Sequence, residues 1–240
     1  MERVQWRNQD GVAVLEMCNG ANAMDLGFAR EMDGVLDEIL DHSEITALVL
    51  TSSPGKNFSQ GVDLQWMGDR YTKGDIQSIK DFVYGMNHVF KRLLLLPIPA
   101  VAAINGHAFG NGAILACACD FRFMGKDHGF FCFPEVDVSV PFLPGMIAFV
   151  RKAVPEYLFN EMLLSGKRMT AEELEVHNVV VRASDSCETC VSDAIAFAAG
   201  FQKKRGIFGE LKQRKHKEII QVMETQDPAY IDAFNLMVIE

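Results

Sequence analysis

The feature that most constrains the fold is a glycine-rich turn ahead of an apolar segment. Residues 105–120 read NGHAFGNGAILACACD, in which Gly110 and Gly112 flank Asn111 directly before a run of small apolar residues. Glycines this dense predict a tight backbone turn that leads into a buried helix, because glycine adopts backbone angles that other residues avoid. The first amides of a helix have no acceptor within it and attract negative charge. The turn therefore predicts an anion site at the start of a buried helix.

The anion is not expected to be a nucleotide phosphate. The phosphate-loop pattern GxxxxGK[ST] is absent from the sequence, and the Gly110-Asn111-Gly112 turn has no third glycine three residues on. The remaining candidate is a smaller anion, such as one that exists only during a reaction.

The rest of the chain alternates apolar strand patterns with amphipathic helix patterns, and it contains no repeat or flexible linker. An Asp-Gly turn predicts a hairpin at the N-terminus, and a capping box begins at Thr170. The predicted strands are 4–7, 12–17, 45–51, 97–104, 121–124 and 129–133, and the predicted helices include 25–41, 76–95, 210–224 and 228–238. This order predicts one α/β domain with a helical tail.

Composition argues against two broad classes of function. The net charge of −9 and the isoelectric point near 5.2 disfavour proteins that bind nucleic acids or membrane surfaces, since such binding rests on basic patches. No stretch approaches the roughly 18 consecutive apolar residues of a membrane span, and the first residues do not resemble a signal peptide. We therefore expect a cytoplasmic protein without nucleic-acid or membrane partners.

The six cysteines do not suggest a disulfide framework in a chain of 240 residues that lacks a secretion signal. Cys187 and Cys190 have the CxxC spacing of redox and metal sites, but the sequence offers no second pair and no nearby histidine pair. We therefore expect a structural role for both cysteines and no metal site.

Three motifs in order resemble the crotonase superfamily, which includes enoyl-CoA hydratases and isomerases. They are FSQGVDL at 58–64, NGHAFGNG at 105–112 and FCFPE at 131–135, and the resemblance covers about residues 4–200. It implies an α/β fold with a crotonase-like (ββα)n spiral core, which we place at 1–195, and a C-terminal helical trimerisation region at 196–240. It also implies a homotrimer or a dimer of trimers.

The resemblance answers which anion the turn would bind. Family members hold the thioester carbonyl of an acyl-CoA between two backbone amides, which then stabilise an enolate oxyanion. Mapped onto this sequence, the donors are the amides of Gln60 and Asn111, and Gly61, Gly110 and Gly112 shape the turns. Both donor residues are larger than is usual in the family, but only their amides are needed. No cofactor is implied, because coenzyme A enters as part of the substrate.

The resemblance also suggests which reaction follows. Hydratases of the family hold water with two glutamates, and the corresponding positions here are Ile114 and Glu135. One carboxylate still suffices to remove a proton from C2 of a 3-enoyl thioester and return it at C4. An apolar residue at the first position and Glu at the second resemble the monofunctional 3,2-enoyl-CoA isomerases. Asp137 is a weaker candidate for a second carboxylate on the same strand face.

Other residues are assigned more loosely. The candidates for the acyl pocket are Ile114, Trp66, Met67, Phe133 and Phe142. The candidates for contacts with coenzyme A phosphates are Lys203, Lys204, Arg205 and Lys212, whose alternative role is a solvated helix face. Two other functions stay open: another crotonase reaction, such as hydration, decarboxylation or thioester hydrolysis, and a noncatalytic CoA-binding role.

Overall fold

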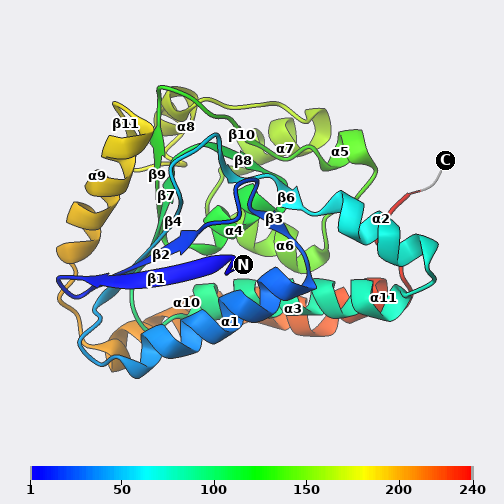
Figure 1. Cartoon of the computed structure of the whole chain (residues 1–240), viewed down its shortest axis with the longest axis horizontal. Coiled ribbons are helices and arrows are strands. Elements are labelled where there is room, and N and C mark those ends of the chain that lie inside the picture. The colour runs from blue at the N-terminus through cyan, green and yellow to red at the C-terminus, as the bar shows by residue number, and fades with distance from the viewer. Residues whose placement is uncertain (1, 239–240) are drawn as a thin grey trace.

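The computed structural model describes residues 2–238 and is built around a six-stranded sheet (Figure 1). Its strand order is β1-β2-β4-β7-β9-β11. Only the β1–β2 hairpin is antiparallel, and each of the other neighbouring pairs is parallel. These strands are β1 (Val4–Gln9), β2 (Val12–Met17), β4 (Ala47–Ser52), β7 (Ala100–Ile104), β9 (Phe121–Gly125) and β11 (Arg182–Ser184).

The hairpin turn follows from two residues with positive φ. Asp10 has φ +52° and Gly11 has φ +84°, which are the angles of a type I′ turn. This turn matches the twist of the flanking strands, so the hairpin predicted from the Asp-Gly pair is confirmed.

Two small sheets give the fold its spiral. After three successive strands of the large sheet, the chain turns into a short strand: β5 follows β4, β8 follows β7 and β10 follows β9. These short strands pair in parallel in the order β10-β8-β5, while β3 pairs with β6. Their bounds are β3 (Ala23–Met24), β5 (Asn57–Ser59), β6 (Gly61–Val62), β8 (His107–Phe109) and β10 (Phe131–Cys132). The predicted crotonase-like spiral is thereby confirmed.

Helices cover both faces of the large sheet (Figure 1). Successive strand side chains point to opposite faces. Val12, Val14 and Val49 therefore pack in one cluster with α9, while Leu15 and Leu48 belong to the main core with α1 and α3. The long helices are α1 (Leu26–Asp41), α3 (Ile76–Leu95), α9 (Cys187–Ala199) and α10 (Arg205–Thr225). Residue 195, where we placed the end of the core, lies inside α9.

The helix ends follow local signals in the sequence. The Asp25 carboxylate accepts the Phe28 amide at 2.8 Å and caps α1, and α3 has its predicted bounds. The capping box of Thr170 and Glu173 is present at the start of α8. The remaining helices are α2 (Leu64–Thr72), α4 (Asn111–Ala118), α5 (Glu135–Val138), α6 (Pro144–Val150), α7 (Glu156–Ser165), α8 (Ala171–Val176) and α11 (Asp227–Asp232).

The C-terminal tail differs from the prediction. The second tail helix ends at Asp232 rather than at 238. The segment after it returns to the core, where the Val238 amide donates a hydrogen bond to the Ser139 carbonyl oxygen at 2.9 Å. Asp227 fixes this path, because its buried carboxylate accepts the Gly145 amide at 2.7 Å and the Asn87 amide group at 2.8 Å. The tail also packs against the core of its own chain, in which Met223 and Leu236 are buried.

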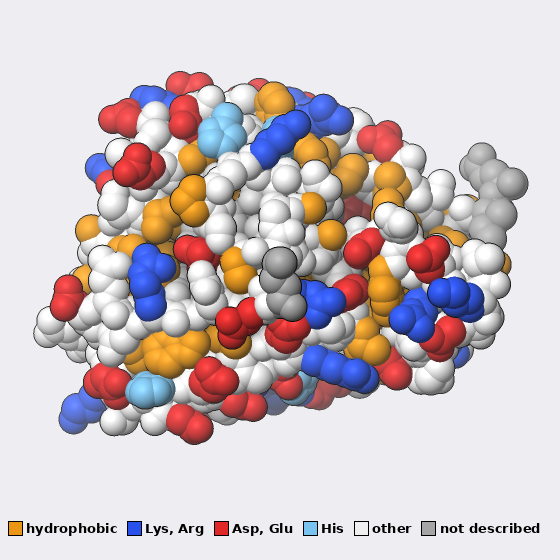
Figure 2. Space-filling view, viewed as in Figure 1, with side chains coloured by type: hydrophobic (Ala, Val, Ile, Leu, Met, Phe, Trp, Pro, Cys, Tyr) orange, Lys and Arg blue, Asp and Glu red, His pale blue; other side chains and the backbone are white. Residues whose placement is uncertain are grey.

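Within residues 2–238, none of the helices combines the length and apolarity that a bilayer crossing requires. On the face drawn in Figure 2, Lys and Arg side chains are interspersed with Asp and Glu, so no continuous basic surface forms there.

Candidate active site

The glycine-rich turn does lead into a buried helix. All eight residues of α4 are buried, and its N-cap, Gly110, has φ +52°. Asn111 is the first helical residue, so its amide has no acceptor within the helix. The Ile114 amide closes the first turn on the Gly110 carbonyl at 2.9 Å.

The two glycine motifs pack directly against each other. A Cβ on Gly61 would lie 2.6 Å from the Phe109 carbonyl oxygen and 3.1 Å from the Asn111 nitrogen, and Gly61 has φ +83°. A Cβ on Gly112 would lie 2.6 Å from the Ser59 carbonyl oxygen. No side chain fits at either position without moving backbone, and this close approach brings the two loops to one site.

The Gln60 amide is not the second oxyanion donor, and that prediction is wrong. It donates to the Ala21 carbonyl at 3.0 Å. The Asp63 amide donates to Met24 in β3 at 2.9 Å, and adjacent amides of an extended strand point to opposite edges. The Val62 amide therefore points away from β3. Gln60, Val62 and Asn111 all line the cavity, so the hydrogen bonds of the amides decide between Gln60 and Val62. The donor that the geometry favours follows Gly61 rather than precedes it.

Glu135 is a buried carboxyl at the start of α5, at the wall of the same cavity. Its side chain lies against the turn, because a Cβ on Gly110 would be 3.1 Å from Oε1 of Glu135. Among the described residues, Oε2 has no hydrogen-bond partner. Burial raises the pKa of Glu135 from 4.5 to about 8. A buried carboxyl with an unpartnered oxygen and a raised pKa inside a cavity is a candidate general base.

Ile114 lies one turn into α4 and lines the same cavity. Glu135 is the only carboxylate among the described residues of this lining. Asp137 does not join it, because residues 135–138 form a helical turn rather than the expected strand, and Asp137 is exposed. The site thus combines one acid with an apolar wall.

The cavity has a volume of about 120 Å³ and is lined mainly by apolar side chains. Met67 and Phe142 line it as predicted, but Trp66 and Phe133 do not. Phe133 is fully buried and packs edge-to-face against Phe142, with 5.4 Å between the ring centroids. Trp66 packs edge-to-face against Phe82, with 5.6 Å between the ring centroids. Further apolar residues line it that no sequence pattern indicated: Val62, Leu64, Phe82, Val83, Met86, Val138, Val140, Leu143, Met146 and Leu236.

Two of the basic residues predicted at coenzyme A hold the fold together instead. Arg205 donates to the carbonyls of Leu40, His42 and Ile45. Lys212 is buried and donates to the Leu93 carbonyl at 3.0 Å and to the Asp120 carboxylate at 2.8 Å.

Lys203 and Lys204 are exposed in the segment before α10. The neighbouring Arg205 contacts Ile45, which precedes β4, whereas the glycine-rich turn follows the end of β7. Because β4 and β7 are parallel, these positions lie at opposite ends of the sheet. Lys212 lies toward the same end as Arg205, because its partner Asp120 accepts the Ala100 amide at the start of β7. None of the four basic residues lines the cavity of their own chain.

Comparisons with known proteins agree with this geometry. Residues 7–237 match the family model described as enoyl-CoA hydratase/isomerase. The chain is 29% identical over 195 residues to enoyl-CoA delta isomerase 3 of Arabidopsis thaliana, which covers 79% of this chain and 82% of the relative. It is 30% identical over 181 residues to the short-chain-enoyl-CoA hydratase of Clostridium acetobutylicum, covering 74% and 67%.

A solved structure shows the same fold. It is an enoyl-CoA hydratase/isomerase family protein from Pseudomonas syringae, which superimposes with a TM-score of 0.86 at 21% identity and covers 96% of this chain and 97% of its own. The chain belongs to the enoyl-CoA hydratase/isomerase family.

Proposed function

We propose that this protein moves the double bond of a 3-enoyl-CoA into conjugation, giving the 2-enoyl-CoA. The observation that carries the proposal is the buried carboxyl of Glu135, the one carboxylate among the described lining residues, beside the two glycine loops. Its Oε2 has no partner among the described residues, and Ile114 stands where a second acid would face it. One carboxylate can shuttle a proton between two carbons, whereas adding water calls for groups that hold and activate the water as well.

In the proposed mechanism, the thioester oxygen accepts hydrogen bonds from the backbone amides of Val62 and Asn111. Ionised Glu135 takes the proton from C2, and the electron pair of that C–H bond delocalises through C1 onto the oxygen. The same carboxyl then gives its proton to C4, where the electron pair of the C3–C4 double bond forms the new C–H bond. The electron pair between C1 and C2 moves to form the C2–C3 double bond, and the oxyanion returns to a carbonyl. Two aligned amides stabilise this oxyanion, and one such donor is typically worth about 3 kcal/mol of barrier.

The apolar wall supports this chemistry in two ways. Ile114 excludes water that would compete for the intermediate, and desolvation makes Glu135 a stronger base once it is ionised. The proposed reaction needs no cofactor beyond the coenzyme A that the substrate carries. Relatives named as enoyl-CoA delta isomerases add support.

The test is incubation with a 3-enoyl-CoA while the conjugated 2-enoyl thioester absorbance is followed. We expect fast formation of the 2-enoyl-CoA and slow loss of a 2-enoyl-CoA supplied directly. Efficient hydration of that second substrate would contradict the proposal in favour of the activity named for the Clostridium relative. Binding of acyl-CoA without turnover of either substrate would favour a noncatalytic role.

A further inference from the structure

The segment that follows α11 contributes to the wall of the cavity that Glu135 lines, here named the acyl cavity. Its Leu236 side chain is only 8% exposed and lines this cavity together with residues of α2, α3 and α5. Residues 233–238, which we name the tail strap, leave α11 and pass α2 (Figure 1). No step of the proposed reaction uses Leu236, yet this side chain lies where the substrate would bind.

The tail strap begins with a reversal of the chain at an unusual residue. Phe234 has φ +57°, a left-handed angle that is rare for a bulky side chain. The Phe234 amide donates to the Ile231 carbonyl oxygen at 3.0 Å, and the Asn235 amide donates to the Tyr230 carbonyl oxygen at 2.8 Å. These are the two bonds of a Schellman motif, whose left-handed residue is usually glycine. Tyr71 of α2 stacks on the Phe234 ring, with 6.1 Å between the ring centroids, and helps to hold this turn.

Both ends of the tail strap are fixed to elements that wall the acyl cavity. Just before the strap, Oδ1 of Asp232 accepts the hydroxyl of Tyr84, which belongs to α3, at 2.9 Å. At the other end, the Val238 amide donates to the carbonyl oxygen of Ser139, the C-cap of α5, at 2.9 Å. Leu236 lies between these two attachments, so its position at the cavity is set from both sides.

We propose that Leu236 limits the length of the acyl chain, so that the substrates are short-chain enoyl-CoA thioesters of about four to six carbons. The acyl cavity has a volume of about 120 Å³, which is below the about 150 Å³ of an apolar cavity that holds benzene. The thioester carbon and the reacting carbons C2 to C4 fill much of this space, and a longer chain would have to displace the tail strap. This inference rests on the proposed function, since it takes an acyl thioester as the occupant of the cavity.

The test measures binding and turnover by the full-length protein over a series of chain lengths. Calorimetry with the saturated butanoyl-, hexanoyl-, octanoyl- and decanoyl-CoA reports binding without any reaction. In the parent, affinity should rise about fourfold per buried methylene up to hexanoyl-CoA and then stop rising. The value of kcat/KM for 3-enoyl-CoAs of the same lengths should show the same limit.

Variants at Leu236 should move this limit in both directions. Leu236→Ala should bind octanoyl-CoA at least about tenfold more tightly than the parent does, because the vacated space buries further methylenes. Leu236→Phe should bind hexanoyl-CoA at least about tenfold more weakly. Met237→Ala is the matched control and should keep the parental profile, because Met237 belongs to the same strap and packs against the core without lining the cavity. If Leu236→Ala does not fold, Leu236→Phe decides.

The two proposals fail in different ways. A length limit that moves with the residue at position 236 in the saturated series, in a protein that isomerises none of the 3-enoyl-CoAs, would uphold the role of Leu236 and remove the isomerase function. Isomerisation with the same chain-length profile in the parent and in both Leu236 variants would overturn the role of Leu236 alone. Affinity of the parent that keeps rising through decanoyl-CoA would overturn it as well.

Discussion

Glu135→Gln separates a catalytic carboxylate from a structural one, because it should change activity and stability in opposite directions. The amide keeps the size of the side chain but does not accept a proton from C2 at neutral pH. We expect isomerisation to fall at least about a hundredfold, while acyl-CoA affinity stays within a few fold of the parent.

The stability change follows from the raised pKa. Below pH 4.5, Glu135 is protonated in both the folded and the unfolded chain, so its ionisation costs nothing. Between pH 4.5 and about 8, the unfolded chain loses the proton while the folded chain retains it, so the free energy of unfolding falls as pH rises. The fall is about 1.4 kcal/mol per pH unit and reaches about 5 kcal/mol above pH 8. Glutamine removes this loss.

The assay is urea unfolding of the parent and the variant at pH 5, 6, 7 and 8. Relative to the parent, the variant should gain about 3.5 kcal/mol in the free energy of unfolding between pH 5 and pH 8, whatever constant offset the amide adds. Asp137→Asn is the matched control, since Asp137 is an exposed carboxylate in the same short helix, and it should show neither effect. A parallel pH dependence of stability in Glu135→Gln and the parent would refute the reasoning from burial, and parental activity would refute the role as base.

Four further outcomes are expected. The value of kcat/KM should rise about tenfold per pH unit below pH 8 and then level off, because the free enzyme must ionise Glu135; a flat profile from pH 6 to 9 would contradict this. Gly61→Ala should cost at least about a hundredfold in kcat, because the new methyl would lie 2.6 Å from the Phe109 carbonyl oxygen and 3.1 Å from the Asn111 nitrogen and would shift the turn that holds the Asn111 amide. Gly20→Ala is its control, with φ +80° and no described atom within 4 Å of the new carbon, and it should cost stability but little activity. Ile114→Glu should lower the free energy of unfolding by a few kcal/mol and gain at most weak hydration, measured as loss of 2-enoyl thioester absorbance, since the two buried acids would share a proton. Sedimentation at micromolar concentration should show a trimer or hexamer; a monomer would contradict the assembly implied by the family.

The sequence by itself determined the local elements, because their causes act over a few residues. Apolar spacing gave α3 its bounds, the Asp-Gly pair specified the hairpin, and Gly110 and Gly112 marked the start of the buried helix α4. The same local patterns located Glu135 and Ile114, since each motif occupies a continuous stretch.

Only the tertiary structure decided which groups of these stretches face the cavity. Whether the Gln60 or the Val62 amide is free depends on the residues before and within β3, some 40 positions earlier in the chain. In sequence, Arg205 and Lys212 look like solvated cations. In the structure, each donates hydrogen bonds to backbone carbonyls of elements that are distant in the chain. Leu236 reaches the cavity because the tail turns back after α11.

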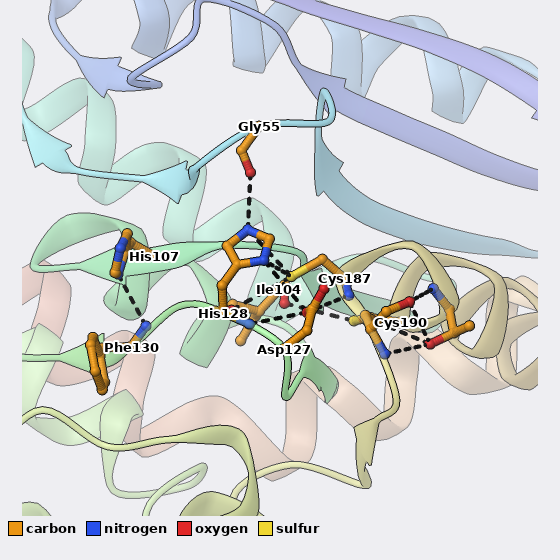
Figure 3. A network of polar contacts seen from close by, with 10 residues as sticks. Gly55, Ile104, His107, Asp127, His128, Phe130, Cys187 and Cys190 are labelled. Atoms are coloured by element: carbon orange, nitrogen blue, oxygen red, sulfur yellow. Dashed lines mark hydrogen bonds and ion pairs between the residues drawn. The ribbon is translucent and has the colours of Figure 1, made fainter.

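The cysteine pair shows the same limit most sharply. In sequence, no histidine lies near the segment that carries Cys187 and Cys190. The parallel pairing of β11 with β9 places the start of α9 beside the turn that carries Asp127 and His128 (Figure 3). Local patterns report propensity and periodicity, whereas the meeting of side chains from distant segments is set by the registers and packing of the whole sheet.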